Sequence, residues 1–268
     1  MWEEFAYNLL NEGISSQVVF YQSGFNYMQK IHNSSKTDLE YSISLDEDVI
    51  LGNHAWDNFI ENINILDDYK NLVISPLMSI GVDMVDTFVE LLNGNIDNIY
   101  LNVDFIKTGE AWKVDYTSLN THTIYSDRWD YLSFYKSVEK INHHYKGIHP
   151  VRVSSDAQTA IAKLVLDNYD EFLKKRNTEF IIYDRPYFTN HIFAIKTKVW
   201  NCLLNKKEFF KDAYDEVALN LFRRHNNMNI VTLTSALGIH AAYNTIGKEA
   251  QYKIEQILLE GLNEKISY

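Results

Sequence analysis

Short strand patterns and amphipathic helix patterns alternate along most of this 268-residue chain. Strand patterns occupy residues 17–21, 39–45, 71–75, 99–103, 180–183, 192–196 and 229–234. Helix patterns, with apolar residues three or four positions apart, occupy residues 2–12, 25–32, 56–63, 84–92, 156–172, 215–223 and 254–262. Such alternation is typical of layered α/β folds, and no repeat, low-complexity linker or clear domain boundary interrupts it. We therefore expect a single α/β domain over residues 1–268.

Local signals predict several boundaries within this domain. We expect Pro76 to end the strand at 71–75, and Ser154 or Ser155 to cap the helix that begins near Asp156. Residues 104–150 are rich in Tyr, Trp and His and fit neither pattern, so we interpret them as an elaborated insertion or subdomain. Long insertions of this kind often carry specificity.

The charge of the chain limits its partners. Hydrophobic residues make up 46% and charged residues 23%, which is typical of a globular protein, and the formal net charge is −11. An extended grip on a phosphate backbone needs clustered Lys and Arg, whereas the only dense basic runs here are 174–176 and 223–224. Nucleic acid is therefore not expected as the main ligand.

Cysteine content and hydropathy indicate the compartment. The single cysteine, Cys202, excludes an internal disulfide and is typical of a reducing compartment. It lies beside Trp200 and Leu203, so we expect a buried structural thiol. The acidic start of the chain lacks signal-peptide features, and no stretch approaches the roughly 18 to 20 apolar residues of a membrane span. We expect a soluble cytoplasmic protein without a membrane span.

A strand that ends in three carboxylates is the first chemical signal. Leu39, Tyr41, Ile43 and Leu45 alternate with polar residues, and Asp46, Glu47 and Asp48 follow at once. Three adjacent acids repel each other, and Mg²⁺ or Mn²⁺ with a bound diphosphate would neutralise them, because carboxylate oxygens suit these cations. Ligands also gather at the carboxyl ends of strands in open α/β sheets. The alternative is a solvated acidic turn.

Asp215 and Glu216 form the second signal, because they begin a predicted helix. Acids at this position are favoured by the helix dipole, which is the purely structural interpretation. A carboxylate there that faces a cleft can instead act as a general base.

The third signal is the segment 237–244, which we expect to form a turn directly after a strand. Gly238 permits a close approach of the backbone. The neutral imidazole of His240 can complete a Mn²⁺ site, although a lone histidine among small apolar residues is more often a core residue. A second histidine group, His143, His144 and His149, matches no common zinc spacing.

In this order, the acidic triplet, the Asp-Glu helix start and the Gly-x-His segment resemble the metal-dependent GT-A glycosyltransferases, especially those similar to family 2. The stretch 185–196 is also similar to the strand that precedes the family's acceptor base. The resemblance covers about residues 24–244. It implies a Rossmann-like mixed sheet flanked by helices, with residues 104–150 as an insertion or acceptor subdomain.

The resemblance also implies roles for these residues. Asp46, Glu47 and Asp48 would bind a UDP- or GDP-sugar, and Asp46, Asp48 and His240 would hold Mn²⁺ or Mg²⁺. Glu216, or Asp215 in its place, would be the base of an inverting transfer. The acceptor would be a glycan, a protein or a small molecule, and a base in DNA is disfavoured by the acidic charge.

One departure keeps other functions open. Only 45 residues precede Asp46, so we expect the family's first nucleotide-binding strand to be missing, replaced or contributed by something else. A catalytically impaired binding or structural module is therefore one alternative. A metal-dependent phosphohydrolase or nucleotidyltransferase, which would use the same acids on a phosphate ester, is the other.

Overall fold

The computed structural model describes residues 39–46, 49–79, 85–100, 154–183, 191–205, 215–240 and 248–266. The strands are β1 (Tyr41–Leu45), β2 (Val49–Leu51), β3 (Asn71–Met78), β4 (Phe180–Tyr183), β5 (Ile192–Lys196) and β6 (Asn229–His240). The α-helices are α3 (Asn53–Glu61), α4 (Val85–Leu91), α5 (Ile96–Tyr100), α10 (Ser155–Asp167), α11 (Tyr169–Leu173), α12 (Thr197–Leu204), α14 (Asp215–His225) and α15 (Lys248–Ile266), and η1 (Ile63–Asp67) is a 3₁₀ helix.

The strands form one mixed sheet in the order β1-β5-β3-β6-β2, with β4 also paired to β6. β3 and β6 are parallel, whereas β5 is antiparallel to both β1 and β3. β1, β3 and β6 therefore run in the same direction, and their carboxyl ends lie at the same edge of the sheet. The prediction of an α/β fold with a mixed sheet and flanking helices is confirmed. Residues 104–150, the predicted insertion, lie outside the described residues.

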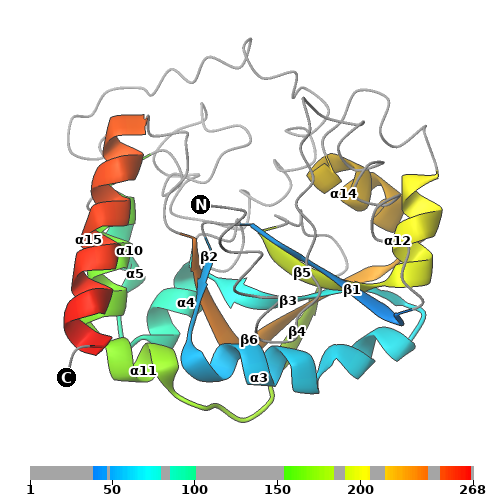
Figure 1. Ribbon diagram of the computed structural model, residues 1–268, viewed down its shortest axis with the longest axis horizontal. Coiled ribbons are helices and arrows are strands. Elements are labelled where there is room, and N and C mark those ends of the chain that lie inside the picture. Colours follow the sequence, from blue (N-terminus) through cyan, green and yellow to red (C-terminus); the bar gives the residue numbers. More distant parts are fainter. Residues whose placement is uncertain are drawn as a thin grey trace, which may run out of the picture.

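Helices cover both faces of this sheet (Figure 1). Leu77 and Met78 are consecutive in β3, so their side chains point to opposite faces. Leu77 packs in a cluster with residues of α4, α10 and α15, whereas Met78 packs in a cluster with residues of α3 and η1. A third cluster joins α12 and α14 to β3, β5 and β6. The buried β3 thus lies between two helical layers.

Pro76 does not end β3, and the prediction that it would is wrong. The strand continues to Met78 because β6 changes register at this point: Pro76 pairs with Leu233, and Leu77 pairs with Leu237. Residues 234–236 therefore bulge out of the ladder, and the missing proline donor coincides with this interruption. Backbone groups of the bulge find other partners, since the amide of Thr234 donates to the carbonyl of Glu179 at 3.0 Å and the Asn58 side chain donates to the carbonyl of Ser235 at 3.0 Å.

Two further sequence predictions fail because tertiary pairing and capping override local pattern. β6 does not end at residue 234 but reaches His240, so Gly238 and His240 lie in a strand and not in a turn. Residues 96–100 form α5 where a strand was predicted to begin at Ile99. The side chain of Asn95 accepts a hydrogen bond from the amide of Asp97 at 2.8 Å, which caps this short helix.

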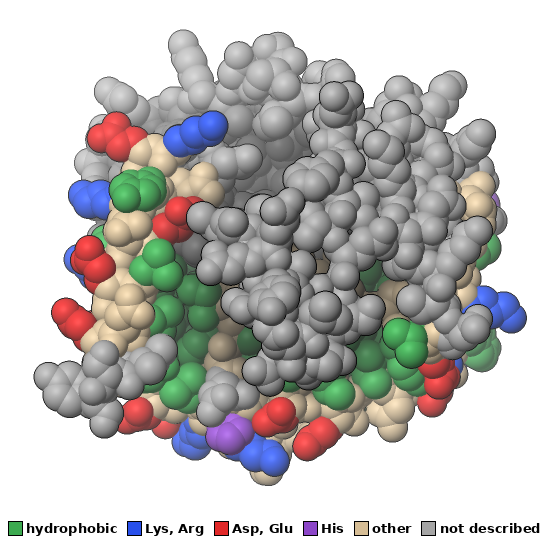
Figure 2. Space-filling view, viewed as in Figure 1, with side chains coloured by type: hydrophobic (Ala, Val, Ile, Leu, Met, Phe, Trp, Pro, Cys, Tyr) green, Lys and Arg blue, Asp and Glu red, His purple; other side chains and the backbone are tan. Residues whose placement is uncertain are grey.

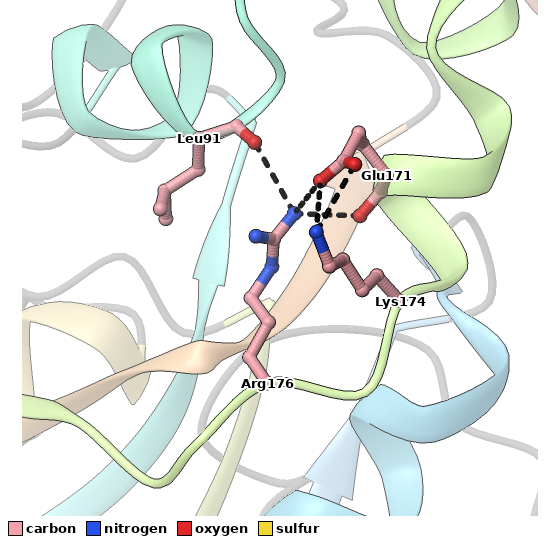
Figure 3. Close-up of polar contacts among 4 residues, drawn as sticks. All are labelled: Leu91, Glu171, Lys174 and Arg176. Atoms are coloured by element: carbon pink, nitrogen blue, oxygen red, sulfur yellow. Dashed lines mark hydrogen bonds and ion pairs between the residues drawn. The ribbon is translucent and has the colours of Figure 1, made fainter.

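Arg176 ties two helix ends to the segment that leads into β4 (Figure 3). Its Nη2 donates to the carbonyl of Leu91 at 3.2 Å and to the carbonyl of Glu171 at 2.6 Å, and it lies 3.6 Å from the Glu171 carboxylate. Lys174 donates to the same carboxylate at 3.2 Å. The guanidinium thereby supplies a donor to the last residue of α4, whose carbonyl has no partner within its own helix.

The described surface carries mixed charge. In Figure 2, acidic and basic side chains are interspersed along the margins of the described part of this face. None of the described helices has the length and apolar character needed to cross a membrane. Cys202 is exposed on α12, so the prediction of a buried thiol is wrong; the helix buries Trp200, Leu203 and Leu204 instead.

Candidate metal centre

The end of β1 and the start of β5 bring Asp46 and His191 together. Leu45 pairs with Ile192 in the antiparallel ladder, so the residue after β1 lies opposite the residue before β5. The amide of Asp46 donates to the carbonyl of His191 at 2.8 Å, which extends the ladder by one step. The two residues are 145 positions apart in the sequence, and their side chains are in contact beside this backbone hydrogen bond.

His240 reaches the same place from the end of β6. It pairs with Val49 of β2, and its amide donates to the hydroxyl of Ser79 at 3.2 Å. Ser79 directly follows β3, and its own amide donates to the carbonyl of Gly238 at 2.8 Å. The backbone of His240 is thus fixed from both sides by neighbouring strands.

Gly238 allows this close packing. A Cβ at this position would lie 2.7 Å from Sδ of Met78 and 2.9 Å from Cδ2 of Leu51, which is well inside van der Waals contact. The sequence predicted a close backbone approach at Gly238, whereas the atoms nearest to it are side-chain atoms of β3 and β2.

Asp46, His191 and His240 form the cluster that we call the Asp–His–His triad. Each offers one ligand atom, and the three atoms lie within 4.8 Å of one another. Nδ1 of His191 is 3.3 Å from Oδ2 of Asp46, and the two imidazole rings lie with their centroids 4.2 Å apart and their planes at 48°. Two nitrogens and one oxygen therefore lie close together at the carboxyl edge of the sheet.

The triad is closed on one side and open on the other. The exposed fractions of His191 and His240 are 7% and 6%, whereas 42% of the Asp46 side chain is exposed. Imidazole nitrogens and a carboxylate oxygen are both common ligand atoms for a metal ion. Asp46 is therefore the member of the triad that solvent reaches.

The structure brings together two of the sequence-predicted ligands. Asp46 and His240 were expected to share a metal, and both belong to the triad. Glu47 and Asp48 lie outside the described residues, as do His143, His144 and His149. His191 was not predicted as a ligand, because its local signal is no more than a polar residue directly before the apolar strand β5.

The predicted base residues lie on a different element. Asp215 and Glu216 are the first two residues of α14, so the prediction that they begin a helix is confirmed. Their side chains lie outside the described part of the structure. Leu219 and Phe222 of the same helix are buried in the cluster that contains α12, and α14 packs against that helix.

A second polar cluster holds the opposite end of β1. Tyr41 donates to Oδ1 of Asp67 at 2.7 Å, and Lys196 lies 2.7 Å from Asp67 and 3.2 Å from Glu40. The hydrogen bond to Asp67 is the main cause that raises the pKa of Tyr41 to about 12. The hydrogen bond with Lys196 is the main cause that lowers the pKa of Asp67 and raises the pKa of Lys196. This cluster joins β1 and β5 to η1 and takes no part in the triad.

No family model, no curated protein and no solved structure matches the chain. The resemblance to GT-A glycosyltransferases therefore rests on the motifs and their order alone.

Proposed function

We propose that the chain is a metal-dependent glycosyltransferase that moves a sugar from a UDP- or GDP-sugar to an acceptor hydroxyl with inversion. The observation that carries the proposal is the meeting of Asp46 and His240 at the edge where β1, β3 and β6 end. Ligands of α/β sheets bind at this edge, beyond the carboxyl ends of the strands. The motifs that resemble the GT-A family supply the donor and the reaction type.

In this proposal, Asp46 and His240 hold Mn²⁺ or Mg²⁺, with Asp48 as a further carboxylate. The bound cation would act as a Lewis acid on the departing diphosphate. Asp46 suits this role because its carboxylate is partly exposed and faces solvent from a backbone position that the ladder fixes. His240 suits it because its burial keeps the ring in one orientation.

Glu216, or Asp215 in its place, takes the proton of the acceptor hydroxyl in this proposal. The acceptor oxygen then attacks the anomeric carbon from the face opposite the diphosphate, the bond to the diphosphate oxygen breaks, and the configuration inverts. General-base assistance of this kind is worth about 10²–10⁴-fold in rate. The position of both residues at the start of α14 supports the proposal only through its similarity to the family's motif order.

The experiment is thermal stabilisation of the full chain by UDP, GDP, CDP and dTDP, each with and without Mn²⁺. A ligand at 100 times its dissociation constant adds about 2.7 kcal/mol of stability, which is readily measured. We expect one nucleotide to stabilise the protein only with metal, and the Asp46→Asn variant to lose this response. Asp57→Asn is the matched control, because Asp57 is an exposed carboxylate on α3. Failure of every nucleotide would overturn the donor assignment and favour the binding-module alternative.

A metal-dependent phosphohydrolase or nucleotidyltransferase is the second candidate. The observation in its favour is the two-histidine, one-carboxylate set, which is also typical of hydrolytic metal sites. Hydrolysis of a nucleotide-sugar in ¹⁸O-labelled water separates the two. Label in a phosphate group of the products indicates cleavage at phosphorus, whereas an unlabelled nucleoside diphosphate indicates cleavage at the anomeric carbon and glycosyl transfer to water.

A further inference from the structure

We propose that His191 is a third protein ligand of this centre, and that the Asp–His–His triad selects a first-row transition metal such as Zn²⁺ over Mg²⁺. The resemblance to GT-A enzymes does not supply His191; the pairing of β1 with β5 does. The inference concerns the same site as the proposed function, but it needs neither a nucleotide nor turnover.

The distances suit a metal with short bonds. In a tetrahedral site with metal–ligand bonds of about 2.0–2.1 Å, neighbouring ligand atoms lie about 3.3 Å apart. Oδ2 of Asp46 and Nδ1 of His191 lie 3.3 Å apart. Since the widest pair in the triad is no more than 4.8 Å apart, closing it around one ion takes a movement of at most about 1.5 Å, within reach of side-chain rotation.

The donor atoms decide which metal is favoured. Mg²⁺ prefers an all-oxygen octahedron and retains several waters, whereas imidazole suits zinc, iron, nickel and copper. Two of the three donors of the triad are imidazole nitrogens, and both rings are buried. A catalytic zinc takes three protein ligands and keeps one position for water or substrate. The exposed carboxylate side of Asp46 provides that position.

The backbone holds the ligands in place before an ion arrives. The carbonyl of His191 accepts a hydrogen bond from the amide of Asp46, and the amide of His240 donates one to the Ser79 hydroxyl. Each ligand therefore lies at a strand end whose backbone is bonded to a neighbouring strand or to the residue that follows it. A preorganised set loses little conformational entropy when it binds the metal. The rival interpretation is that Asp46 and His191 form a simple hydrogen-bonded pair on which His240 packs; that arrangement binds no metal.

The test is metal binding by the full chain after chelator treatment, with Zn²⁺, Co²⁺, Mn²⁺ and Mg²⁺ as the probes. We expect one Co²⁺ per chain to give the intense visible absorption of a low-symmetry site, Zn²⁺ to displace it, and millimolar Mg²⁺ to leave it unchanged. His191→Ala and His240→Ala should each weaken Zn²⁺ binding by more than about 100-fold, because even an outer-shell partner of a ligand is worth 10- to 100-fold. His54→Ala is the matched control, because His54 is a partly exposed histidine on α3.

Circular dichroism checks that the variants fold. His191→Asn repeats the test with a polar side chain, which changes the volume less than His191→Ala does. Zinc binding by folded His191→Ala that equals the wild type would overturn the ligand assignment, and displacement of Co²⁺ by Mg²⁺ would overturn the selectivity. Zinc binding without any nucleotide response supports the inference and overturns the proposed donor. Nucleotide binding with Mg²⁺ alone, without loss in His191→Ala, supports the proposed function and overturns the inference.

Discussion

The amide of Asp46 donates to the carbonyl of His191 at 2.8 Å while the side chains of the same two residues meet at 3.3 Å. One antiparallel step therefore fixes both the backbones and the spacing of two candidate ligands. His240 completes the set from β6, which lies two strands away from β5 with β3 between them. The carboxyl ends of three parallel strands and the amino end of an antiparallel one thus share one edge, and that edge gathers side chains that are far apart in the sequence.

Metal binding should stabilise the fold, because the ligands come from β1, β5 and β6 and an ion joins them. At a free Zn²⁺ concentration 100 times the dissociation constant, we expect about 2.7 kcal/mol of additional stability. Urea unfolding of chelator-treated and zinc-loaded protein measures it. His240→Ala should abolish the gain, and His54→Ala should keep it. A gain of equal size in His240→Ala would mean that zinc binds elsewhere.

Gly238→Ala should destabilise the protein. The new Cβ would lie 2.7 Å from Sδ of Met78 and 2.9 Å from Cδ2 of Leu51, and overpacking of a filled core costs about 1–3 kcal/mol. The midpoint of urea unfolding measures this loss. In the Met78→Ala background the same substitution should cost less, because the nearest clashing atom is gone. An equal cost in both backgrounds would contradict the steric explanation.

The sequence predicted β4 and β5 at their observed bounds, because apolar β-formers between polar residues leave little choice of element. It failed at β6, where Thr234 and Ser235 resemble the end of a strand and instead form a bulge that lets the strand continue. Asp46 and His240 were selected for their chemistry, and the structure places them together. His191 was passed over, because its relation to Asp46 exists only through strand pairing. Local pattern thus predicts elements, whereas register and bulges, which depend on partners distant in the sequence, decide which side chains meet.

Ser154→Ala should weaken the start of α10. Oγ of Ser154 accepts a hydrogen bond from the amide of Ala157 at 3.2 Å, as the sequence predicted for one of the two serines, and the side chain is buried. Loss of such a cap typically costs about 1 kcal/mol, with a range of 0.5–2. Urea unfolding should show this loss for Ser154→Ala and a much smaller one for Ser155→Ala, whose side chain does not cap the helix. Equal losses in the two variants would assign the effect to something other than the cap.

The Tyr41–Asp67 hydrogen bond should make stability fall at alkaline pH. The pKa of Tyr41 is raised from 10.0 to about 12, so the protonated phenol is favoured in the folded protein. Its contribution is complete below pH 10 and is lost as the pH rises towards 12. Asp67 is exposed and solvent screens the pair, so the change in stability is small, and the titration itself is the sharper measurement.

The tyrosinate absorbance of the wild type minus that of Tyr41→Phe isolates this residue among the 18 tyrosines. We expect the difference curve to have its midpoint near 12 in the wild type. In Asp67→Asn the midpoint should move towards 10, because both the carboxylate acceptor and its negative charge are removed. Lys196→Met serves as the comparison. It removes a positive charge that lowers the pKa of Tyr41, so it should not lower the midpoint as Asp67→Asn does. A midpoint near 10 in the wild type would show that Tyr41 and Asp67 are not hydrogen-bonded in solution.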